Sequence, residues 1–133
     1  MSEHRFLDLQ GRPRAALDPA DRGLAYGDGL FETLLAVDGE PVWWDGHWQR
    51  LLRGCELLGL PAPQAGPVHD QARALAGAGR CVVKLVLTRG PGGRGYAPPD
   101  QPDPCLLLSR HDAPPAWPSE GVAMRSCSTR MAI

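Results

Sequence analysis

The sequence predicts an α+β domain, a mostly antiparallel sheet with two helices on one face, and three observations lead to this fold class. Short apolar segments typical of strands recur along the 133 residues. Two of these segments are joined by Asp38-Gly39, a dipeptide that favours tight hairpin turns. Two further segments, with apolar residues at helical spacing, lie between groups of strands. This order of elements is typical of a helix layer packed on an antiparallel sheet.

Strands dominate the N-terminal third. Residues 6–9 alternate weakly and predict a first short strand, after which residues 11–13 turn the chain. Residues 30–37, with the sequence L-F-E-T-L-L-A-V, and residues 41–44 predict the two strands of a β-hairpin. Because side chains alternate along a strand, Phe31 faces one way and Glu32 the other, so one of these faces carries a charge or meets solvent.

Two helices are expected after the hairpin. Asp45 suits an N-cap, and Gly59, followed by Pro61, ends the helical pattern. Between them the apolar residues recur at helical spacing, at Trp48, Leu51, Leu52, Cys55 and Leu58. Residues 68–77 predict a second, weaker helix.

Apolar strands are expected again in the C-terminal half. Residues 81–88, C-V-V-K-L-V-L-T, form a nearly continuous apolar run, and residues 104–109 form another. Residues 121–129 alternate loosely and predict a last strand. The final residues carry no helix stop, turn or polar tail, so we expect a chain cut at the end of a strand.

Charge and composition exclude several classes of protein. The chain has 14 Lys and Arg against 15 Asp and Glu, a net charge of −1, which favours neither a nucleic acid nor a membrane as partner. No apolar run approaches the roughly 20 residues that cross a bilayer, and the first residues lack the layout of a secretory signal, so we expect a cytoplasmic protein. The histidines are too scattered for a metal set. The cysteines lack zinc-site spacing and are expected to be reduced and packed, at Cys55, Cys81, Cys105 and Cys127.

Two glycines flank Asp28 immediately before the first hairpin strand. They let the backbone turn tightly and let the Asp28 carboxylate bond to nearby amides. The simpler alternative is a plain turn with no further role.

A polar stripe runs beside the apolar face of the first expected helix. His47, Arg50 and Gly54 follow one another at helical spacing. An arginine at the rim of a buried face is suited to clamp a phosphate, because its planar donors match phosphate oxygens two at a time, and glycine leaves room for close approach. The alternative is a surface arginine whose stem covers an apolar neighbour.

The loop at residues 89–96 holds four glycines and two arginines, so backbone amides and guanidinium groups can converge on an anion there. It is not a Walker A loop and does not open a helix as a dinucleotide-binding loop does. A flexible hairpin is the alternative, and a single copy in a neutral protein makes a weak RNA contact.

Three segments taken together resemble a known family: R-G-L-A-Y-G-D-G-L-F-E-T (22–33), D-G-x-x-x-x-x-D-G-H-W-Q-R-L (38–51) and L-V-L-T-R-G-P-G-G-R-G-Y (85–96). In order and spacing they are similar to the N-terminal domain of the fold-type IV pyridoxal-phosphate enzymes, which include branched-chain and D-amino acid aminotransferases and aminodeoxychorismate lyases. The third segment looks most like the lyases. These eliminate pyruvate from 4-amino-4-deoxychorismate and leave 4-aminobenzoate for folate biosynthesis.

The resemblance implies roles for five residues. Arg50 matches the family arginine that binds the phosphate of the cofactor, pyridoxal phosphate, and His47 matches the histidine beside it. Phe31 stands where relatives often have a tyrosine that faces the substrate. Arg94 and Tyr96 match loop positions that meet the substrate carboxylate, which suits a dicarboxylate such as aminodeoxychorismate.

The resemblance also implies that residues 1–130 are an N-terminal domain, that residues 131–133 begin a linker, and that the C-terminal domain is absent. The family's Schiff-base lysine belongs to that domain, so we expect no catalytic residue here and no independent activity. Lys84 is the only lysine, and we interpret it as a strand residue. The full-length enzyme is expected to be a homodimer. An aminotransferase domain, or a non-catalytic module that binds an anion or a partner, remains the alternative.

Overall fold

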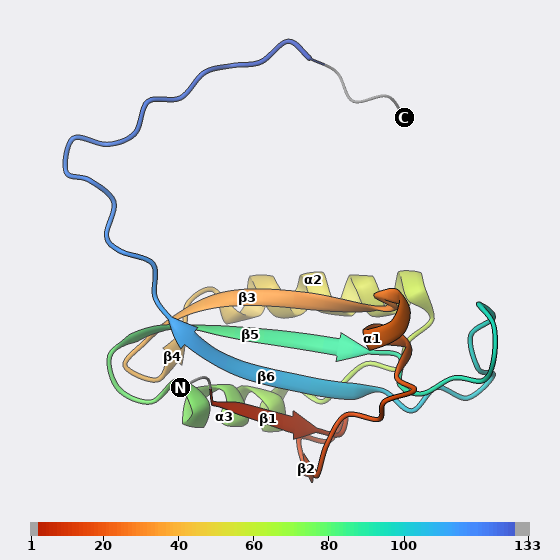
Figure 1. The fold of residues 1–133 in the computed structure, drawn as a ribbon. Helices are drawn as coiled ribbons and strands as arrows, with labels where there is room; N and C mark the ends of the chain where they lie inside the picture. Colours follow the sequence, from red (N-terminus) through yellow and green to blue (C-terminus); the bar gives the residue numbers. More distant parts are fainter. Residues whose placement is uncertain (1–2, 130–133) are drawn as a thin grey trace.

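The computed structural model describes residues 3–129 and contains a six-stranded antiparallel sheet with three helices (Figure 1). The predicted α+β class is confirmed. The strand order is β2-β1-β6-β5-β3-β4. The elements in chain order are β1 (His4–Leu7), β2 (Pro13–Arg14), α1 (Arg22–Tyr26), β3 (Gly29–Val37), β4 (Glu40–Pro41), α2 (Trp44–Leu58), α3 (Ala65–Ala76), β5 (Arg80–Thr88) and β6 (Cys105–Asp112).

Alternation along the long strands decides which face is the core. On β3 and β5 every second residue is buried, and the two long helices cover that face of the sheet. The core unites residues of the sheet and of both helices, among them Leu34, Leu51, Cys55, Val68, Leu75, Val83, Leu85, Leu106 and Leu108. Burial of this apolar surface is the main source of the fold's stability.

In the described part of the chain, the opposite face of the sheet carries only the short helix α1, which packs on Thr88 at one end of that face. Phe31 pairs with Val86 on β5, and Thr33 pairs with Lys84, so all four side chains lie on this open face. The Lys84 ammonium lies 5.1 Å from the centre of the Phe31 ring. The sole lysine is therefore a half-buried strand residue on the open face, as expected.

Several element boundaries differ from the sequence prediction. The helix α2 begins at Trp44, and its N-cap is Trp43 in a left-handed conformation with φ 56°, so Asp45 lies in the first turn and is not the cap. The same turn at Trp43 ends β4 after two residues, which is why the predicted strand at 41–44 is short. Gly59 caps the C terminus of α2 as expected.

Three expectations were wrong or incomplete. The strand β1 lies two residues earlier than its predicted range, β6 runs on to Asp112 beyond its predicted end, and the short elements α1 and β2 were not predicted. Residues 121–129 form no strand, because in the described structure they lie exposed and away from any strand that could pair with them (Figure 1). Cys127 lies in this segment and is exposed, whereas the other three cysteines are buried as expected. The expected linker at 131–133 lies outside the described residues.

Candidate functional site

Glu32, His47 and Arg50 form a hydrogen-bonded cluster where α2 crosses β3. Arg50 donates from Nε to Glu32 Oε1 at 2.7 Å and from Nη2 to Oε2 at 2.5 Å. His47 Nδ1 lies 2.7 Å from Glu32 Oε2. His47 and Arg50 are one helical turn apart and so reach the same strand residue. The structure thus joins the two predicted cofactor residues through a third residue that the motif comparison did not single out.

Glu32 lies on the buried face of β3, where alternation would place an apolar residue. Its side chain is only 5% exposed. Burial alone would raise the pKa of Glu32, but the hydrogen bonds from Arg50 and His47 outweigh burial and hold this pKa below its ordinary value. The carboxylate therefore stays ionised, and a charge at an inward strand position was the sequence signal that could have identified it.

Arg50 opens onto a groove between β3 and α2. The side chain is 63% exposed although one edge of its guanidinium is held by Glu32. The groove has a volume of about 400 Å³ and is bordered by a second arginine, Arg53, and by Phe31. Within residues 3–129, Arg50 Nη1 has no hydrogen-bond partner. The groove therefore offers cationic donors suited to a phosphate group.

Gly54 has a different role from the one expected. A Cβ atom at this position would come within 2.8 Å of the Leu30 side chain. The glycine thus lets α2 approach β3 closely, and the space that it leaves is filled by Leu30 and not by a ligand.

A second polar cluster lies just before β3 begins. Asp28 Oδ2 accepts a hydrogen bond from Arg22 Nε and another from Arg89 Nε, both at 2.8 Å. Burial would raise the pKa of Asp28, but the two arginines hold it below its ordinary value. The segment that begins at Asp21 is therefore more than a plain turn: Asp21 caps the short helix α1, and Arg22 anchors the following turn.

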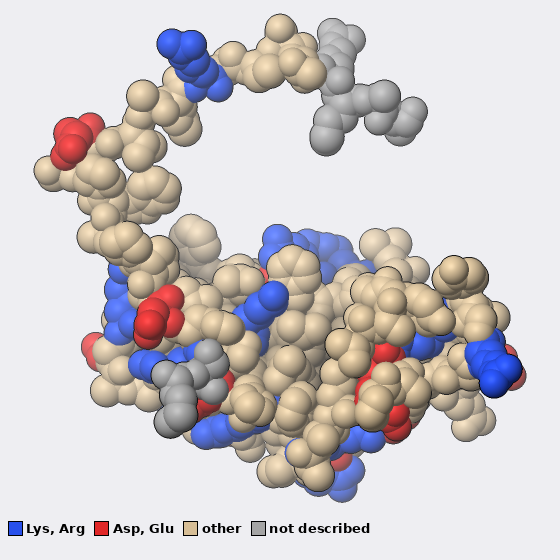
Figure 2. All heavy atoms as spheres, viewed as in Figure 1, with Lys and Arg blue, Asp and Glu red and all other residues tan. Residues whose placement is uncertain are grey.

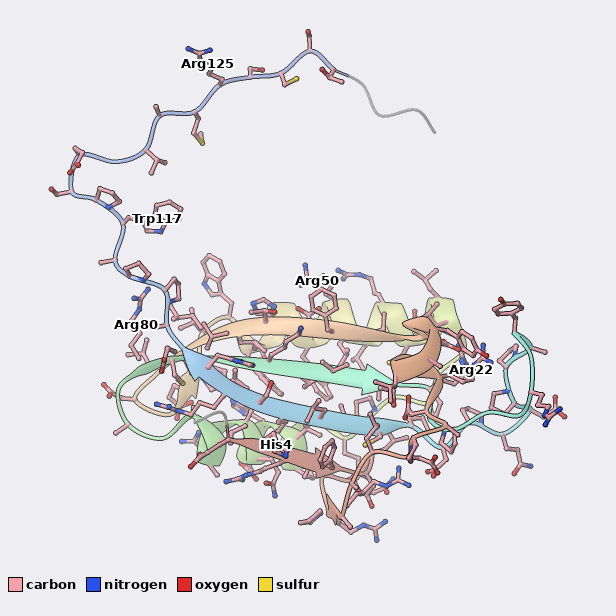
Figure 3. All side chains as sticks on the ribbon, viewed as in Figure 1. His4, Arg22, Arg50, Arg80, Trp117 and Arg125 are labelled. Carbon is pink, nitrogen blue, oxygen red and sulfur yellow. The ribbon has the colours of Figure 1, made fainter. Side chains whose placement is uncertain are left out.

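The loop after β5 carries the predicted substrate residues. Arg94 and Tyr96 are both exposed, and the Tyr96 ring lies 5.5 Å from that of Tyr26 on α1. Phe31, on the open face, borders the Arg50 groove and a second groove of about 250 Å³ beside α1. Figure 3 shows Arg50 on α2 and Arg22 beside the loop, so the candidate residues fall into two groups.

Other kinds of site find little support in residues 3–129. No group of three or more His, Cys, Asp or Glu in this range is arranged to hold a metal ion. Acidic and basic side chains are interspersed over the face drawn in Figure 2, so no broad basic patch appears on it. None of the described helices combines the length and apolarity that crossing a membrane requires.

Comparison with known proteins gives consistent matches. The family model for amino-transferase class IV matches residues 29–132. The aminodeoxychorismate lyase of Vibrio harveyi is 32% identical over 132 residues, which cover 94% of this chain and 48% of that protein. The structure of 4-amino-4-deoxychorismate lyase from Pseudomonas aeruginosa is 40% identical with a TM-score of 0.69, over 90% of this chain and 42% of that one. A hypothetical aminotransferase from Mycobacterium tuberculosis in its PLP-bound form is 26% identical with a TM-score of 0.63, over 84% and 41%. The chain spans a little under half the length of these relatives.

Proposed function

This chain belongs to the amino-transferase class IV family, and from that membership we propose that it forms the part of an aminodeoxychorismate lyase that binds the cofactor phosphate and the substrate carboxylate. The reaction eliminates pyruvate from 4-amino-4-deoxychorismate and leaves 4-aminobenzoate for folate biosynthesis. Residues 1–130 act as the N-terminal domain, and a second domain supplies the lysine that carries the cofactor. The relatives are about twice as long as this chain, which supports this division.

The observation that carries the proposal is the orientation of Arg50 at its groove. Glu32 occupies two of the five N–H groups of the guanidinium, and the remaining three are free to bind phosphate oxygens. Arg53 adds a second positive charge at the same groove. The residues present therefore fit the phosphate of pyridoxal phosphate, which when bound supplies an electron sink for bond cleavage in the substrate. His47 supports Arg50 by sharing the Glu32 carboxylate.

The substrate residues lie on the loop after β5 and on β3. Arg94 binds a carboxylate of the substrate, and Tyr96 contributes a hydroxyl and an aromatic face. Phe31 forms a wall between the two grooves without the hydroxyl that a tyrosine would bring. These three side chains are exposed, as contact with a ligand requires.

The identities of 32% and 40% to the two lyases support a lyase over an aminotransferase. An aminotransferase is the second candidate, because the Mycobacterium tuberculosis protein shares the fold at 26% identity. Supplying the C-terminal half of the Pseudomonas aeruginosa lyase and measuring pyruvate release against amino-group transfer separates the two. Transfer without pyruvate release contradicts the lyase assignment, and the absence of both reactions favours a non-catalytic module. We further expect a cytoplasmic homodimer once the enzyme is whole.

The phosphate grip is tested on the chain itself. Pyridoxal phosphate and pyridoxal differ only in the phosphate, so titration with both compounds isolates its contribution. We expect the phosphate to strengthen binding roughly tenfold or more, as a charge-assisted arginine contact does, and Arg50→Gln to remove this difference. Arg12→Gln, which changes an exposed arginine paired with Asp8 far from the groove, is the control. Equal binding of the two compounds by the unchanged chain contradicts the proposal.

A further inference from the structure

The loop that carries Arg94 and Tyr96 is held by one buried side chain. Arg22 is only 6% exposed and donates from Nη2 to the Tyr96 carbonyl at 2.7 Å. Its Nη1 lies 3.2 Å from the Ala97 carbonyl and 3.4 Å from that of Gly95. A single guanidinium therefore satisfies three successive carbonyl groups at the end of the loop, where no strand is present to do so.

Arg22 also holds the beginning of the loop. Its backbone N–H donates to the Gly90 carbonyl at 2.9 Å, and Gly92 N–H donates to the Ala20 carbonyl at 3.3 Å. A Cβ atom at Gly92 would come within 2.8 Å of Arg22 Cδ, so the loop backbone lies directly on the arginine stem. Both ends of the loop are thus fixed on the same residue, and Arg94 lies between them.

The arginine is itself anchored to the rest of the domain. Its Nε donates to Asp28, which is shared with Arg89, and Arg89 Nη2 donates to the Leu58 carbonyl at the end of α2 at 2.9 Å. The Arg22 guanidinium also lies 5.0 Å from the centre of the Tyr26 ring, and Tyr26 contacts Tyr96. A connected set of polar contacts therefore ties the loop to the helix that carries Arg50.

We infer that Arg22 is a positioning residue for substrate recognition. It fixes the loop at residues 90–97, so that Arg94 and Tyr96 are already in place when a carboxylate-bearing ligand binds. The inference rests on the proposed function of Arg94. Ordering the loop before binding removes an entropic cost that a free loop would add to each binding event. Lysine retains the charge but has a single nitrogen, so it does not reproduce contacts to three carbonyls and a carboxylate.

Two substitutions test the role of Arg22 from its two sides. Arg22→Lys removes the fork of donors, and Gly92→Ala pushes the loop off the arginine stem without changing the buried cluster. Gly93→Ala is the matched control for the second change, because a Cβ there meets nothing within 4 Å. Arg94→Gln reports how much binding depends on the loop arginine. If Arg22→Lys fails to fold, Gly92→Ala still tests the inference.

Two measurements are made on each variant of the whole chain. One is amide hydrogen exchange at positions 22 and 92, whose N–H groups donate to the Gly90 and Ala20 carbonyls and hold the loop; the other is affinity for chorismate, the 4-hydroxy counterpart of the proposed substrate. We expect Arg22→Lys and Gly92→Ala to speed loop exchange about tenfold or more and to weaken binding about tenfold, while Gly93→Ala changes neither. If Arg94→Gln weakens binding but the Arg22 and Gly92 changes do not, the inference is overturned and the proposed function stands. If Arg94→Gln has no effect, the proposed role of Arg94 fails and the inference fails with it.

Discussion

Glu32 and Arg50 form a two-point ion pair between a carboxylate that is 5% exposed and a guanidinium that is 63% exposed. The pair joins the buried side of β3 to the edge of α2 that borders the groove. The carboxylate is buried and the guanidinium is open, so removing one partner affects the other differently. An exposed arginine that loses its carboxylate binds water in its place, whereas nothing replaces the interactions of the buried carboxylate.

Glu32→Gln should lower the free energy of unfolding by about 2 kcal/mol, because a charged acceptor of several hydrogen bonds becomes an amide that cannot accept them all. Urea unfolding of the variant and the unchanged chain measures this difference. Glu56→Gln changes an exposed glutamate on α2 and should have little effect. Equal losses for the two variants would show that the buried network contributes nothing of its own.

The free energy of unfolding should decrease as the pH is lowered into the acid range, because two carboxylates become protonated there. The folded-state pKa values of Glu32 and Asp28 lie below their ordinary values of 4.5 and 3.8. Their contribution to stability is therefore complete above those ordinary values and is lost as the pH falls through the lower folded-state values. Urea unfolding between pH 7 and pH 3 should show this loss, and a Glu32→Gln, Asp28→Asn double variant should show a flatter profile. An unchanged profile would exclude these two groups as its source.

Cys127 should be the thiol that reacts first with a disulfide reagent such as DTNB. It is exposed, and its hydrogen bonds with Thr129 lower its pKa, which favours the reactive thiolate. Burial raises the pKa of Cys55 and of Cys105, and Cys81 is also buried. Fast reaction of the native chain should disappear in Cys127→Ser, and the buried thiols should react only on unfolding. A fast phase that persists in this variant would contradict the assignment.

The long elements of the fold were predictable because their signals are local. The helix α2 and the strands β3 and β5 carry their own periodicity, so the sequence predicts them within a few residues. The helix α1 has five residues and depends on the Asp21 cap and on contacts with the loop after β5. Residues 121–129 alternate loosely but form no strand, because no partner strand lies beside them in the described structure.

The site was predictable only in part, because only some of its contacts join residues that are close in sequence. His47 and Arg50 lie three residues apart, so helical spacing already places them together. Their partner Glu32 lies on another element, 15 and 18 residues away in sequence. Asp28 and Arg89 are 61 residues apart, and no local pattern joins them. Side chains that act across the sheet become visible only once its register is known.

The close approach of α2 to β3 should depend on Gly54 and not on Gly46, although both glycines lie in the same helix. A methyl group at Gly54 would come within 2.8 Å of the Leu30 side chain, so Gly54→Ala forces α2 or Leu30 to shift and should lower the free energy of unfolding by about 1–3 kcal/mol. A methyl group at Gly46 meets nothing within 4 Å, and Gly46→Ala should raise it by up to about 1 kcal/mol through helix propensity. Because Arg50 lies one turn before Gly54, Gly54→Ala should also weaken the preference for pyridoxal phosphate over pyridoxal. Urea unfolding measures the changes in stability, and titration with pyridoxal phosphate and with pyridoxal measures the preference. A stabilising Gly54→Ala would contradict the close packing of Gly54 against Leu30.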